Sequence, residues 1–82
     1  MHEMSIALEI ARIAGDRLGD AAPELVGVAV DVGDCAGVEP PSLEFCLEAV
    51  FKTPPFTGAR PYIQRCGGDV LRVAWLEIDD GS

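Results

Sequence analysis

The chain has 82 residues, a mass of 8.7 kDa and a formal net charge of −8 at pH 7, which fits one small domain and argues against a multidomain enzyme. Hydrophobic residues make up 49% and charged residues 24%, a balance typical of a folded domain rather than of a disordered chain. The acidic excess argues against a nucleic-acid partner, because a phosphate backbone would be repelled. No apolar run approaches the roughly 20 residues that span a bilayer, so no membrane partner is expected.

The first half of the chain predicts a helix followed by a strand. Over residues 4–18, apolar side chains recur at helical spacing, and Gly19 is placed to end the helix. Residues 25–32 alternate as a strand does. Its valines are expected to share one face: Val26, Val28, Val30 and Val32.

The second half predicts a helix and two further strands. Pro40 and Pro41 can open a helix, because its first turn needs no N–H donor. That helix is expected to end near residue 52, before Pro54-Pro55. Residues 59–65 and 69–79 read as strands, and the Gly67-Gly68 pair between them is typical of a tight hairpin. The expected fold class is therefore α+β, with two helices packed on one face of a three-stranded mixed β-sheet.

The N-terminus is the first candidate for chemistry. Met1 supplies an α-amine, and His2 supplies a backbone amide nitrogen and an imidazole ring. Three nitrogens of this kind can chelate one metal in a plane, a geometry that suits Ni(II) or Cu(II). The backbone amide of Glu3 can complete the square. Because His2 is the sole histidine, any site that uses imidazole must use this residue, although a histidine at a chain end is more often a solvated side chain.

The three cysteines are the second candidate. They are widely spaced, odd in number and without a Cys-x-x-Cys pair, so free thiols in a reducing, cytoplasmic setting are expected. Cys46 lies on the apolar stripe of the second helix and is expected to be a core residue. Cys35 and Cys66 fall in predicted turns, where either could act as a soft metal ligand, although an uninvolved thiol is the simpler interpretation. No catalytic arrangement is found, so an enzyme is not expected.

Several segments together resemble one known family. Met1-His2-Glu3-Met4-Ser5 is similar to the opening of HypA, the nickel metallochaperone of [NiFe]-hydrogenase maturation. The likeness continues through the segment Val30–Pro40, which ends in Gly-Val-x-Pro, the helix around Leu43–Glu48, the strand entry Thr57-Gly58-Ala59 and the final strand Gly68–Asp79. It covers nearly the whole chain in the right order.

The resemblance implies a single HypA-like nickel-binding domain over residues 1–82. Nickel would be held through Met1 and His2, with Glu3 supporting the site, and would be passed on with a HypB-like GTPase to a hydrogenase large subunit. Family members also carry a zinc-binding domain with two Cys-x-x-Cys pairs between the last two strands. Here residues 65–69 occupy that place with one cysteine, so zinc binding is not expected.

Two hypotheses of different classes follow. In the first, the protein is a nickel-delivery accessory protein. In the second, it is a HypA-like scaffold that binds a maturation partner without delivering metal, and the missing zinc loop favours this version. A third, unrelated interpretation is a small oligomeric structural protein, whose self-association would need a large apolar patch. Leu71, Val73 and Trp75 could contribute to such a surface if their strand face lacks helical cover.

Overall fold

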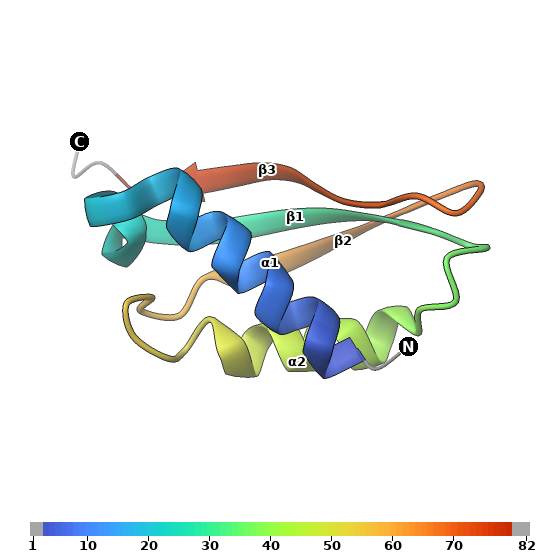
Figure 1. Cartoon of the computed structure of the whole chain (residues 1–82), viewed down its shortest axis with the longest axis horizontal. Coiled ribbons are helices and arrows are strands. Elements are labelled where there is room, and N and C mark those ends of the chain that lie inside the picture. Colours follow the sequence, from blue (N-terminus) through green and yellow to red (C-terminus); the bar gives the residue numbers. More distant parts are fainter. Residues whose placement is uncertain (1–2, 80–82) are drawn as a thin grey trace.

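A computed structural model of the chain describes residues 3–79. Two helices lie on one side of a three-stranded sheet, as Figure 1 shows, so the expected α+β class is confirmed. In chain order the elements are α1 (Glu3–Leu18), a 3-10 helix η1 (Gly19–Glu24), β1 (Leu25–Gly33), α2 (Pro40–Val50), β2 (Arg60–Cys66) and β3 (Leu71–Ile78). Each predicted helix and strand is present, with bounds shifted by no more than a few residues.

The helices form where the apolar spacing and the end signals predict them. In α1 the buried side chains are Ile6, Ala7, Ile10 and Ala14, which make one continuous stripe at helical spacing. Gly19 follows the helix with a φ of 53°, a conformation that glycine adopts without a Cβ penalty. In α2 the prolines occupy the first helical positions, and Leu43 and Leu47 are fully buried.

The sheet order, which the sequence left open, excludes the expected tight hairpin. The segments 59–65 and 69–79 were expected to pair as a tight hairpin near residues 66–69, but the strand order is β2-β1-β3. The central strand β1 pairs parallel with β2 and antiparallel with β3. The physical reason is burial. β1 carries a single charged side chain, whereas β2 and β3 each carry two, and the middle position gives a strand hydrogen-bonding partners along both of its edges.

The turn between β2 and β3 therefore crosses over the end of β1. The amide of Gly33 donates to the carbonyl of Val70 at 2.7 Å, and the amide of Asp34 donates to the carbonyl of Cys66 at 2.9 Å. A Cβ at Gly33 would lie 2.2 Å from the carbonyl oxygen of Gly68. Position 33 thus requires glycine, because the crossing backbone occupies the space of a side chain.

Two register shifts in the β1–β3 pairing change which side chains face the helices. They lie between Leu25 and Gly27 and between Ala29 and Val30. At the first, Leu25 turns into the core and Val26 is exposed, so the prediction that Val26 shares the buried valine face is wrong. A bulge adds one residue to one strand and so reverses the alternation beyond it.

The second shift separates Trp75 from Leu71 and Val73, which were expected on one face. Leu71 and Val73 pack against the core on the helical side. Trp75 lies on the opposite, open face, where its ring centroid is 5.4 Å from that of Tyr62. Both rings flank Ala29, which pairs with Tyr62 on one side and Trp75 on the other. The residue that β3 gains at this bulge is Ala74.

Candidate metal site at the N-terminus

Only one of the three residues predicted for the metal site lies in the described part of the chain. Met1 and His2 lie outside the described residues, and Glu3 is the first residue of α1. Glu3 is half-buried, and its carboxylate accepts a hydrogen bond of 3.2 Å from the backbone amide of Glu39. A carboxylate in the first turn also interacts favourably with the positive end of the helix dipole. The residue that follows His2 is therefore fixed to the body of the domain.

The partner of Glu3 lies at the start of the second helix. Glu39 directly precedes Pro40, the first residue of α2, and the first turn of α1 lies beside α2 (Figure 1). The sequence separates these two residues by 36 positions, so sequence reasoning had no signal for this contact. Its consequence is that the chain enters α1 at a defined place, next to the loop that joins β1 to α2.

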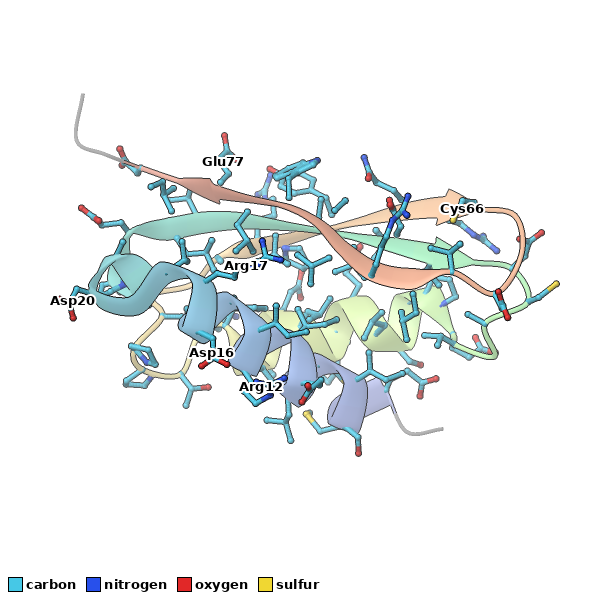
Figure 2. The ribbon with its side chains drawn as sticks, turned by 45° about the horizontal axis from the view of Figure 1, so that its top comes forward. Arg12, Asp16, Arg17, Asp20, Cys66 and Glu77 are labelled. Atoms are coloured by element: carbon cyan, nitrogen blue, oxygen red, sulfur yellow. The ribbon has the colours of Figure 1, made fainter. Side chains whose placement is uncertain are left out.

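The two turn cysteines lie at one end of the sheet. Cys66, labelled in Figure 2, is the last residue of β2, and its partner in the parallel pairing with β1 is Gly33. The amide of Cys35 donates to the carbonyl of Gly68 at 2.7 Å, so the two cysteine-bearing segments are joined through their backbones. Both thiols are exposed.

The described residues do not assemble a metal centre of their own. Among residues 3–79, no group of three or more histidine, cysteine, aspartate or glutamate side chains is placed to hold a metal ion. Cys35 and Cys66 therefore stay predictions as soft ligands. Cys46 is half-buried and packs against the hydrophobic core, as its position on the apolar stripe of α2 predicts.

Charged side chains elsewhere form surface features. On the outside of α1, Arg12 lies between Glu9 and Asp16 and bonds both carboxylates; Figure 2 shows Arg12 and Asp16 adjacent on this helix. The hydrogen bond from Arg12 lowers the pKa of the Glu9 carboxyl, and the same bond raises the pKa of Arg12. Ion pairs between side chains this exposed stabilise a helix only weakly. We assign this cluster no functional role.

Two further features of the described chain bear on function. Glu44 and Glu48 are both exposed on α2, as side chains on a solvated helix edge are. No helix in the described part of the chain is both long enough and apolar enough to cross a membrane.

Comparison with known proteins gives one consistent result. Residues 1–72 match the family model described as hydrogenase/urease nickel incorporation, metallochaperone, hypA. Three of its relatives, each named hydrogenase maturation factor HypA, illustrate the match. That of Geobacter metallireducens is 37% identical over 68 residues, covering 83% of this chain and 60% of the relative. That of Desulfatibacillum aliphaticivorans is 41% identical over 66 residues, covering 78% and 51%. That of Albidiferax ferrireducens is 32% identical over 78 residues, covering 94% and 69%.

The matches extend over most of this chain but over less of its relatives. The aligned part spans 60% of the length of the Geobacter metallireducens protein and 57% of the Geotalea uraniireducens protein. The matched family is one of metallochaperones, which agrees with the expectation of a protein that is not an enzyme.

Proposed function

The chain belongs to the HypA family of hydrogenase and urease nickel-incorporation metallochaperones, and from that premise we propose that it binds Ni(II) at its N-terminus for delivery to a [NiFe]-hydrogenase. The observation that carries this proposal is the Met1-His2-Glu3 start joined to a fixed first turn of α1. Nickel is the cargo in this account, and the chain supplies the atoms that hold and release it.

The donor set follows from the chemistry of the first residues. The α-amine of Met1, the amide nitrogen of His2 and the imidazole of His2 provide three nitrogens in sequence, and the amide of Glu3 can provide the fourth. Nitrogen donors in a plane suit Ni(II). Before they bind, the amine and the imidazole must give up protons. The affinity is therefore expected to fall as the pH is lowered below the ordinary pKa values of these groups, about 8 for an α-amine and about 6.5 for histidine.

Glu3 acts as a supporting residue in this proposal. Its carboxylate is already engaged by the amide of Glu39 at 3.2 Å, so it holds the entry to α1 in place instead of coordinating nickel. Residues that surround the ligands of a metal ion commonly orient those ligands through hydrogen bonds. A site at a chain end also leaves nickel accessible to an acceptor protein, which suits transfer better than storage.

The partners proposed are a HypB-like GTPase and a hydrogenase large subunit, met in the cytoplasm. The acidic character of the chain, with a net charge of −8, favours docking on basic surfaces and weaker docking at high salt. Zinc is not part of the proposal, because one local cysteine, Cys66, cannot make a four-sulfur zinc site.

A three-residue extension tests the proposal sharply. Adding three glycines ahead of Met1 places the free amine too far from His2 for the amine, the neighbouring amide and the imidazole to close on one ion. A single added residue would not serve, because an amine, two backbone amides and a histidine ring in third position still place four nitrogens in a plane around Ni(II). We expect calorimetry to show one Ni(II) per chain for the protein that begins at Met1 and none of that binding for the extended form. The matched control is three glycines added after Ser82, which should bind as the parent does.

The same extension distinguishes the scaffold hypothesis. If the extended protein loses nickel but still binds the purified GTPase or large subunit, contact and delivery are separate properties of the chain. If the extended protein binds nickel as tightly as the parent, the N-terminal site is refuted, and a scaffold without metal delivery becomes the better account.

A further inference from the structure

The outer edge of β3 is the feature of the described chain that the proposed function does not use. In the order β2-β1-β3, β3 pairs with β1 along one edge and with no described strand along the other. Unpaired strand edges are sites for pairing with another chain, and natural proteins usually block them with proline, a charge or a covering segment. β3 contains no proline, and its two charged residues, Arg72 and Glu77, lie toward opposite ends.

We propose that two copies of this chain associate by pairing their β3 strands antiparallel about a two-fold axis between Ala74 and Trp75, which makes one continuous sheet. An antiparallel pair of this kind uses the same surface on both copies. The proposal does not depend on nickel binding and concerns a different surface of the domain.

The bulge makes β3 complementary to itself in this register. With the axis between Ala74 and Trp75, a residue on one side of the axis faces the residue that lies the same number of positions beyond it. Val73 therefore faces Leu76, and Leu71 faces Ile78. Opposed residues must point to the same face of the sheet. In a regular strand Val73 and Leu76 would point to opposite faces, but here they pair with Val30 and Val28 on the same helical side, because the shift occurs between them.

The charges agree with the same register. Arg72 and Glu77 pair with Asp31 and Gly27 of β1, which both lie on the open face of the sheet, and Figure 2 shows Glu77 directed away from the helices. In the proposed pairing, Arg72 of each copy faces Glu77 of the other. Opposite charges placed directly across two strands stabilise the pair, and like charges destabilise it. Because of the two-fold symmetry this contact is made twice.

An apolar groove beside β3 gives room for the second copy. It has a volume of about 350 Å³ and lies between α1 and β3, lined mainly by Ile6, Ile10, Ile13, Leu71 and Val73. In the proposed register, Ile78 of the second copy faces Leu71 at the wall of this groove. Ile78 is 44% exposed in the single chain, and burying it in the groove would remove apolar surface of both copies from water.

The other edge of the sheet lacks these features. β2 contains Pro61, which has no N–H to donate, and carries Arg60 and Arg65 near its two ends. A second β2 strand would therefore meet a missing hydrogen bond and an excess of positive charge. This contrast assigns the association to β3.

Charge variants test the proposal. Sedimentation velocity of the parent chain over a concentration series should show a species of twice the 8.7 kDa mass. Glu77→Arg places arginine opposite Arg72 at both symmetric positions and should weaken the dimer by about tenfold or more in Kd. The matched control, Glu48→Arg, makes the same charge change at an exposed position of α2 and should leave the Kd unchanged.

A mixing experiment checks the register itself. Arg72→Glu on its own should weaken the dimer in the same way, whereas an equimolar mixture with Glu77→Arg should form a one-to-one heterodimer, since every facing pair then has opposite charges. Circular dichroism confirms that each variant is folded; if Arg72→Glu is not, because it loses Asp31, the comparison of Glu77→Arg with Glu48→Arg decides alone. A monomer at all concentrations, or a dimer that Glu77→Arg does not weaken, would overturn the proposal, as would folded single variants that fail to combine.

Discussion

Gly33 is the residue at which the fold leaves no space for a side chain. A Cβ there would lie 2.2 Å from the carbonyl oxygen of Gly68 and 2.7 Å from the amide nitrogen of Val70. Both neighbours are backbone atoms in the segment that crosses the end of β1, so neither can rotate away. Gly33→Ala must therefore displace the crossing segment and break the hydrogen bonds that Gly33 and Asp34 donate to it.

We expect Gly33→Ala to lower the free energy of unfolding by about 1–3 kcal/mol, the usual cost of forcing atoms into an occupied space. Urea unfolding followed by circular dichroism measures this change. Gly67→Ala is the matched control, because a Cβ at Gly67 has no atom within 4 Å, and it should be close to neutral. Equal effects of the two substitutions would show that the crossing segment is not packed as described.

At the scale of elements, Glu3 couples the start of α1 to the start of α2. Glu3→Ala removes the acceptor for the Glu39 amide and is expected to lower the free energy of unfolding by about 1 kcal/mol, which is typical of one hydrogen bond. If this contact also supports the metal site, Glu3→Ala should weaken Ni(II) binding several-fold. Glu3→Gln keeps an oxygen that can accept the bond and should bind nickel nearly as the parent does. Calorimetric titration of both variants makes the comparison, and a loss with Glu3→Gln equal to that with Glu3→Ala would indicate that the charge itself is needed.

The helices and strands also show which features of the fold could be predicted from the sequence. Periodicity located both helices and all three strands, because each element's apolar pattern is local. It could not determine which strand lies in the middle, since the Gly67-Gly68 turn suits a hairpin and also a short crossing over Gly33. Nor did it reveal the bulges that expose Val26 and turn Trp75 away from Val73, because a bulge depends on the partner strand.

At the scale of the whole molecule, a thin two-layer domain holds its first turn through the hydrogen bond between Glu3 and Glu39 and leaves one edge of β3 without a described partner strand. The proposed N-terminal donors follow from the sequence, because they depend only on the order of the first residues. The contact that fixes Glu3 and the self-complementary face of β3 required the folded chain, since both join segments through tertiary placement. The proposed nickel site and the proposed self-association surface lie in different parts of this domain, so each can be tested in a variant that lacks the other.

The most direct test of the proposed function is a Ni(II) titration at about pH 7.5 of the untagged chain that begins at Met1, beside its His2→Ala variant. The account predicts binding of one Ni(II) per chain by the parent, seen by calorimetry and absorbance, and its loss in His2→Ala, because the substitution removes the sole imidazole of the chain. Absence of binding in the parent, or equal binding in His2→Ala, would contradict the N-terminal nickel site.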